Sequence, residues 1–208
     1  MKRVNIIKVI IRLLLVSLVG LISYNVIFDG VLVIDEMMAN FVASIRCDAL
    51  DFWMKFITSF GNTATIFILL LVVIWLLIKM VKNRKLAIFF FSSLVVNVLI
   101  NQGIKTLVKR ERPINSLIHV GGFSFPSGHA MVSMAFYGML ICLFYKLIKN
   151  KKLKYSLMVF CSVLILLIGF SRVYLGVHYF SDVLVGFFVS ILYLDVFSCL
   201  MNKYKIFT

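Results

Sequence analysis

The chain has few residues that would interrupt a helix or carry charge. Its 208 residues include only 2 prolines and 11 glycines, and charged residues make up 14% of the composition. A soluble domain needs a larger polar surface than this composition can supply. The hydrophobic share of 62% and the mean hydropathy of +1.07 are instead typical of an integral membrane protein. The composition therefore excludes a soluble globular protein and predicts a bundle of apolar helices.

Cysteines and acidic residues are also too few and too scattered to build a disulfide framework or a metal site. The four cysteines follow no metal-ligand or disulfide spacing, and three of them fall inside apolar runs, so we expect them to act as small apolar residues. Asp35 and Glu36 form the only adjacent acidic pair, which we expect to lie at a solvated helix start. We therefore expect no metal and no other cofactor.

Six apolar runs approach the length of about 20 residues that a helix needs to cross a bilayer. They cover residues 13–27, 63–78, 86–108, 127–145, 155–170 and 182–200. Residues 29–55 carry an apolar stripe at helical spacing, which predicts an amphipathic helix in the membrane interface or, equally, a helix packed across the bundle. Because no repeat or linker divides the chain, we expect residues 1–208 to form one all-α domain of six transmembrane helices.

Basic residues are distributed unevenly along the chain. Of the 22 lysines and arginines, 15 fall at the two termini and in the second-to-third and fourth-to-fifth connections, whereas seven of the eight acids fall at or beyond the opposite face. The net charge of +14 could indicate a nucleic-acid partner, but short basic clusters between apolar runs indicate membrane topology instead. The positive-inside rule then predicts that both termini are cytoplasmic, with no nucleic-acid partner.

A short motif opens the fourth apolar run and reads Phe125-Pro126-Ser127-Gly128-His129. Proline is tolerated in the first turn of a helix, and Ser127 can cap the free amides of that turn. Gly128 lets a ligand approach a helix N-terminus, whose open N–H groups suit a phosphate. His129 can carry a proton near neutral pH. Taken alone, the motif is more simply an ordinary helix start with a stray histidine.

Lys105 and Arg112 lie at the start of the loop that precedes this motif. They are seven residues apart, which places them on one helical face if the third helix continues that far. Two cations on one face can clamp a phosphate, with arginine supplying a bidentate fork. The alternative is a basic cluster that contacts anionic lipid head groups, and we prefer this alternative for Lys109 and Arg110.

His178 and Asp182 lie in and after the last connection, which also holds Arg172. They are four residues apart, so at the start of a helix the carboxylate can hold one ring nitrogen and leave the other as a nucleophile or base. The alternative is that Asp182 only caps the helix and His178 is an interfacial histidine. Ionisable residues close to hydrocarbon are costly, which favours a functional interpretation.

These segments together resemble the signature of the type 2 phosphatidic acid phosphatase family. The family pattern is K-x6-RP, then PSGH, then SR-x5-H-x3-D, and the chain matches every position in the same order. The matching residues are Lys105, Arg112, Pro113, Pro126, Ser127, Gly128, His129, Ser171, Arg172, His178 and Asp182. The resemblance is specific because it fixes residue types and spacing in three separate places.

The resemblance implies a metal-independent phosphatase that works through a phosphohistidine intermediate. Carried over by position, His178 would attack phosphorus, Asp182 would orient His178, and His129 would protonate the leaving oxygen. The phosphoryl oxygens would be bound by Lys105, Arg112, Ser127, Gly128 and Arg172. Cations and a helix N-terminus can offset the charge of a phosphoryl transition state without a metal.

The expected substrate is a membrane lipid phosphate that is dephosphorylated at the outer face of a bacterial cell membrane. Phosphatidylglycerol phosphate, phosphatidic acid and undecaprenyl diphosphate are the candidates that the family implies, and the lipid bilayer is the expected partner.

Two alternative functions stay open. Vanadate-dependent haloperoxidases resemble the family in the same residues, but they are soluble and larger. A non-catalytic lipid-binding or lipid-moving protein could keep the pocket, although the intact His129, His178 and Asp182 argue against it.

Overall fold

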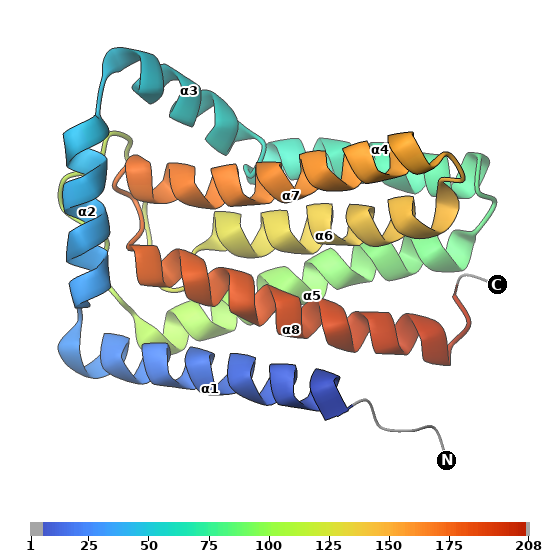
Figure 1. Ribbon diagram of the computed structural model, residues 1–208, viewed down its shortest axis with the longest axis horizontal. Coiled ribbons are helices and arrows are strands. Elements are labelled where there is room, and N and C mark those ends of the chain that lie inside the picture. The colour runs from blue at the N-terminus through green and yellow to red at the C-terminus, as the bar shows by residue number, and fades with distance from the viewer. Residues whose placement is uncertain (1–5, 207–208) are drawn as a thin grey trace.

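The computed structural model of the chain describes residues 6–206, and within this range it consists of eight helices and no strand. The helices are α1 (Ile6–Asp29), α2 (Val33–Ile45), α3 (Asp48–Ser59), α4 (Thr63–Lys79), α5 (Arg84–Val108), α6 (Gly128–Leu147), α7 (Lys151–Tyr174) and α8 (Phe180–Lys203). Figure 1 shows α1, α4, α5, α6, α7 and α8 running roughly side by side, whereas α2 crosses one end of this bundle and α3 slants back from α2 towards α4.

Five of these helices are long and apolar enough to cross a membrane by themselves, namely α1, α5, α6, α7 and α8. The fourth helix has only 17 residues, or about 26 Å at 1.5 Å per residue. Joined to α3 across a bend of 46°, it makes a sixth candidate span. The structure therefore confirms an all-helical chain with five to six spans, in which the second predicted span is short and continues from α3.

The sixth helix lies at the centre of the bundle, where it packs against α5, α7 and α8. Its Phe136 is buried and meets Phe90 of α5 edge to face, with ring centroids 5.6 Å apart. Between helices in lipid, such close packing supplies stability that the hydrophobic effect cannot, because lipid tails are as apolar as the side chains. The start of α6 is consequently held in a fixed place among α5, α7 and α8.

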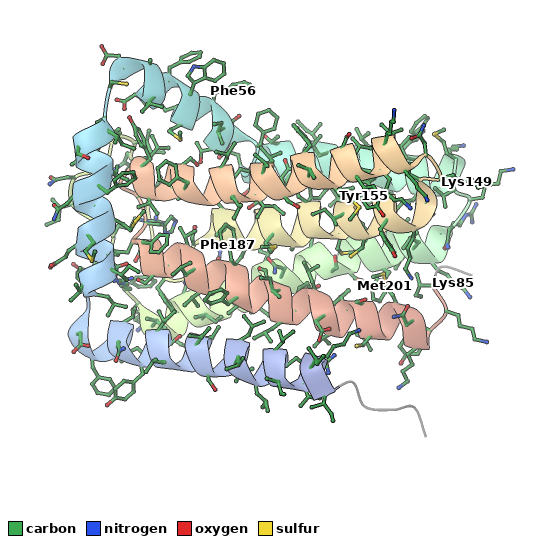
Figure 2. All side chains as sticks on the ribbon, in the orientation of Figure 1. Phe56, Lys85, Lys149, Tyr155, Phe187 and Met201 are labelled. Carbon is green, nitrogen blue, oxygen red and sulfur yellow. The ribbon has the colours of Figure 1, made fainter. Side chains whose placement is uncertain are left out.

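The segment predicted to be one amphipathic helix, residues 29–55, forms α2 and the first part of α3, with a break at Arg46 and Cys47. The second helix packs across the bundle against α7 and α8, as one of the two alternatives expected, and α3 packs on α7. The predicted apolar stripe is divided, since Val42 is buried whereas Phe52 is exposed. Phe56, which follows this segment, is also exposed, and Figure 2 shows it on the outer side of α3.

The two ends of the bundle differ in their charge. The start of α1 and the end of α8 lie at the end opposite to α2 (Figure 1). Figure 2 shows Lys85 and Lys149 projecting from that same end. Asp195 pairs with Arg12 at 2.6 Å and so links α8 to α1. Pairing reduces the cost of holding both charges beside lipid.

The close packing of α7 against α8 at Gly169 can be tested by substitution. A Cβ at this position would overlap the side chains of Phe187 and Val183 on α8. We expect Gly169→Ala to destabilise the protein by about 1–3 kcal/mol through overpacking, which a thermal denaturation midpoint in detergent would show. Gly103→Ala is the matched control, because a Cβ at Gly103 meets nothing within 4 Å. Equal midpoints for the two variants would contradict this packing.

Candidate active site

A cavity of about 970 Å³ lies at the junction of α4, α5, α6 and the connections at the α2 end of the bundle. Six of the predicted site residues line it: Lys105, Arg112, Gly128, His129, Arg172 and His178. Much of the remaining wall is apolar and comes from α4 and α5, including Ile66, Phe67, Leu70, Phe91, Leu94 and Val95. The cavity thus joins a cationic surface to an apolar one.

The start of α6 forms one side of the polar surface. Ser127 is the N-cap residue, and its hydroxyl oxygen accepts from the Ala130 amide at 3.4 Å, as the sequence predicted. Pro126 lies before this cap rather than in the first turn, because the helix begins at Gly128. A Cβ on Gly128 would lie 3.3 Å from Oδ1 of Asn101, so glycine allows α6 to start close against α5.

Arg112 reaches the cavity from a loop and not from a continuing helix, so the predicted shared helical face is wrong. The fifth helix ends at Val108 because Lys109 turns the backbone into the left-handed region, with φ of 52°. Lys105, in the last turn of α5, still lines the same cavity as Arg112. Lys105 Nζ donates to the carbonyl oxygen of Phe123 at 2.5 Å, which holds the ammonium group beside the loop.

The guanidinium group of Arg112 is fixed by backbone carbonyl groups and by His178. It donates to the carbonyl oxygens of Gly121, Gly122, Phe123 and Val177. Its Nη1 lies 3.1 Å from Nε2 of His178. Because arginine can only donate, this contact requires a lone pair on Nε2 and leaves the ring proton on Nδ1.

His178 is buried and faces Asp182 through that Nδ1 atom. It precedes Tyr179, the N-cap residue of α8, so the two residues are not stacked on one helical turn as predicted. Nδ1 lies 3.4 Å from Oδ2 of Asp182 in a contact that does not meet hydrogen-bond geometry. Burial lowers the pKa of His178 to about 4, against an opposing effect of Asp182. The imidazole is consequently neutral at neutral pH.

Asp182 also caps α8. It therefore combines the two roles considered from the sequence, since it faces His178 and caps the helix. Its Oδ2 accepts from the Tyr179 amide at 2.9 Å. The backbone carbonyl group of Asp182 accepts from the Ser127 amide at 3.0 Å, which ties the start of α8 to the start of α6. Ser127 and Asp182 are both fully buried behind the cavity. They therefore support residues that line it.

His129 is positioned by the turn between α3 and α4. Its Nε2 lies 2.8 Å from Oδ1 of Asn62, the N-cap residue of α4. Because an amide oxygen only accepts, Nε2 carries the proton in this arrangement. A Cβ on Gly61 would come within 3.0 Å of the His129 ring, so glycine lets this turn lie against the histidine. The contact between Asn62 and His129 was not predicted.

Arg172 is the third cation of the polar surface and is only 2% exposed. Its Nη1 donates to Oγ1 of Thr58 on α3 at 2.8 Å. Its Nε has no partner among the described residues, although buried polar groups are normally paired. A buried guanidinium group with an open donor is suited to an anion. Thr58 had no sequence signal that distinguished it from a surface residue.

The sequence expectation is also wrong for Arg110 and Asp35. Arg110 does not contact lipid head groups and Asp35 is not solvated, since they are 7% and 2% exposed. They pair with each other at 2.7 Å, and Arg110 also pairs with Asp182. A pairing between residues 75 positions apart leaves no local pattern in a sequence. Lys109 is exposed, as expected.

The site therefore combines positive charge with two histidines in defined protonation states. Lys105, Arg112 and Arg172 surround the space that His129 and His178 line. Across residues 6–206, no three His, Cys, Asp or Glu side chains gather where they could hold a metal ion. This arrangement can bind an anionic group and offer it a nucleophilic nitrogen and a proton donor.

Comparison with known proteins finds sequence relatives in Bacillus subtilis (strain 168). Phosphatidylglycerophosphatase B of Bacillus subtilis (strain 168) is 40% identical over 99 residues, which is 45% of this chain and 47% of that protein. The chain thus matches about half the length of this relative. Undecaprenyl-diphosphatase BcrC of the same organism is 32% identical over 149 residues, covering 69% of this chain and 70% of that protein.

Solved structures show the same fold. The crystal structure of a transmembrane PAP2 type phosphatidylglycerolphosphate phosphatase from Bacillus subtilis has a TM-score of 0.85 at 27% identity, covering 92% of this chain and 96% of the other. LpxE of Aquifex aeolicus has a TM-score of 0.62 at 21% identity, covering 78% and 93%, and so supports the fold alone. The family model for the PAP2 superfamily matches residues 85–206, more than half of the chain. The chain belongs to the PAP2 superfamily.

Proposed function

We propose that this protein is a metal-independent phosphatase of membrane lipids that works through a phosphohistidine intermediate. The observation that carries the proposal is one cavity in which the neutral His178 and three cations adjoin an apolar wall. The relatives named for phosphatidylglycerophosphate and undecaprenyl diphosphate support the substrate class. Phosphatidylglycerol phosphate, phosphatidic acid and undecaprenyl diphosphate are the substrates that we propose to test.

In the first step the phosphoryl group binds among Lys105, Arg112 and Arg172. An incoming phosphoryl oxygen takes the Nη1 donor of Arg112, which frees the lone pair of His178 Nε2 for attack on phosphorus. As the nitrogen–phosphorus bond forms, the bond from phosphorus to the lipid oxygen breaks. His129 acts as the doubly protonated imidazolium: it gives one ring proton to that oxygen and becomes neutral, so the lipid leaves as an alcohol, or as a monophosphate from a diphosphate.

The second step returns the enzyme to its starting state. The phosphorylated ring of His178 is a cation that keeps its Nδ1 proton towards Asp182, whose negative charge stabilises it. His129, now a neutral imidazole, accepts a proton from a water molecule, and the oxygen of that water attacks phosphorus. The nitrogen–phosphorus bond breaks, inorganic phosphate leaves, and His129 again carries the proton. The cations offset the charge of both transition states.

The apolar wall between α4 and α5 suits the tail of such a lipid. Leu70 and Phe91 line the cavity far along these helices from the polar residues Lys105 and Arg112. A pocket that buries apolar atoms while a few polar groups fix orientation is the usual form of a ligand site. The tail would occupy the apolar part while the phosphate meets His178.

The distribution of lysines supports an outward-facing site in a multi-pass membrane protein. Lys85 and Lys149 mark the end of the bundle that also holds the start of α1 and the end of α8 (Figure 2). The positive-inside rule assigns this end to the cytoplasm. The cavity with its phosphate-binding residues lies towards the other end, at which α2 crosses the bundle, and would therefore face the extracytoplasmic leaflet.

Phosphate release from the three candidate lipids, measured in detergent with EDTA present, tests the proposed reaction. We expect the wild type to release phosphate and His178→Ala to be slower by at least about 10³-fold, because it lacks the nucleophile. His119→Ala is the matched control, since His119 is exposed in the loop and does not line the cavity. Folded wild-type protein that releases phosphate from none of the lipids would overturn the proposal in favour of a lipid-binding or lipid-moving protein.

The ionisation of His178 gives a second test. Since burial lowers its pKa to about 4, the ring stays neutral as the pH falls from 8 to 5, and the nucleophile is lost only as the pH falls through about 4. The chain has 3 histidines, so nitrogen NMR of histidine-labelled protein is practical, and His178→Ala assigns the signal. A midpoint at or above about 6.5, the usual histidine value, would contradict this environment.

A further inference from the structure

Arg110 joins two carboxylates that come from opposite parts of the chain. Its Nη1 donates to Oδ1 of Asp182 at 2.5 Å and to the hydroxyl group of Ser181 at 2.8 Å. Its Nη2 donates to Oδ2 of Asp35 at 2.7 Å. The guanidinium group also stacks on the ring of Tyr179, with its central carbon 3.9 Å from the ring centroid. Arg110 is thereby held on the side of Asp182 that faces away from His178.

Asp35 holds the first turn of α8 as well as Arg110. Its two carboxylate oxygens accept from the backbone amide and from the hydroxyl group of Ser181, each at 2.8 Å. It also accepts from the Leu32 amide at the start of its own helix, α2, at 3.2 Å. Since Ser181 precedes Asp182, these contacts fix the backbone from which the Asp182 side chain projects.

Neither Arg110 nor Asp35 lines the cavity, and both are buried, so neither can touch a substrate bound there. Any effect on the reaction must therefore pass through a neighbour, and Asp182 is the neighbour of Arg110 that faces His178. We infer that Arg110 and Asp35 are positioning residues that hold the Asp182 carboxylate, ionised and correctly oriented, against His178. This inference rests on the proposed phosphohistidine reaction and makes α2 part of the apparatus that supports it.

The charge balance of this group explains why both residues are needed. Two carboxylates and one guanidinium group leave one net negative charge, which faces the ring that becomes cationic in the intermediate. Without Arg110, the two buried carboxylates would share one site with no cation to hold them, which is a costly arrangement. Without the charge of Asp35, Arg110 would neutralise Asp182 fully and weaken its hold on the His178 cation.

The test compares phosphate release by Arg110→Gln and Asp35→Asn with two matched controls. Lys109→Gln and Glu36→Gln make the same changes at exposed neighbouring positions. We expect kcat to fall about 10- to 100-fold in the first two variants through misplacement of the nucleophile and to stay at the wild-type value in the controls. The inhibition constant of inorganic phosphate should not change, because the cations that line the cavity are untouched. Arg110→Lys should recover part of kcat, since lysine restores the charge without the fork.

A double-mutant cycle separates positioning from general damage to the fold. If Arg110 and Asp35 act through Asp182, then Arg110→Gln and Asp35→Asn should add no further loss in an Asp182→Asn background. A merely structural defect would lower kcat by the same factor in both backgrounds and would overturn the inference. Thermal midpoints in detergent verify folding, and the near-isosteric Asp35→Asn keeps the test available if Arg110→Gln does not fold.

The outcomes for this inference and for the proposed reaction are distinct. Wild-type kcat in Arg110→Gln and Asp35→Asn, with His178→Ala inactive, would overturn the positioning roles and leave the phosphatase proposal standing. Absence of phosphate release by the wild type would overturn the reaction itself. Loss in both variants that vanishes in the Asp182→Asn background would support the inference.

Discussion

The end of the bundle that holds the cavity depends on one constraint: a charge held beside hydrocarbon must have a partner. Arg110 satisfies it by lying between Asp35 and Asp182, and this cluster joins α2 to the start of α8. Asp182 can then serve as a helix cap and face His178 at the same time. The positions of α2, of the loop after α5 and of α8 are therefore set by the same few contacts.

The cations that line the cavity have hydrogen-bond partners, but these partners are not carboxylates. Arg112 and Lys105 rest on backbone carbonyl groups and Arg172 on Thr58, partners that carry no full negative charge. Their positive charge is thus oriented but not neutralised. An anionic phosphoryl group would supply the missing charge, so the site can be held together in the free protein and still be open to an anion.

The apolar half of the cavity connects this chemistry to the membrane. The site lies where α4 and α5 leave an apolar wall next to the cationic surface. In the proposed reaction, a lipid would present its phosphate there without leaving the bilayer. The two sequence relatives have names that refer to different lipid phosphates. The cationic surface suits the phosphate group that such lipids share, so we expect the residues along the apolar wall to govern which lipid is preferred.

Features that depend on neighbouring residues could be predicted from the amino-acid sequence. Apolar runs indicated the spans, Ser127 indicated a helix start, and the spacing from Lys105 to Asp182 matched the family signature. The folded chain was needed to show that Arg112 leaves the helix, that Asn62 meets His129, and that Asp35 and Arg110 are buried partners. The physical reason is the separation of the interacting residues along the chain. Periodicity and capping involve residues a few positions apart, whereas the partner of a buried charge is a distant side chain that the packing of the helices brings to it.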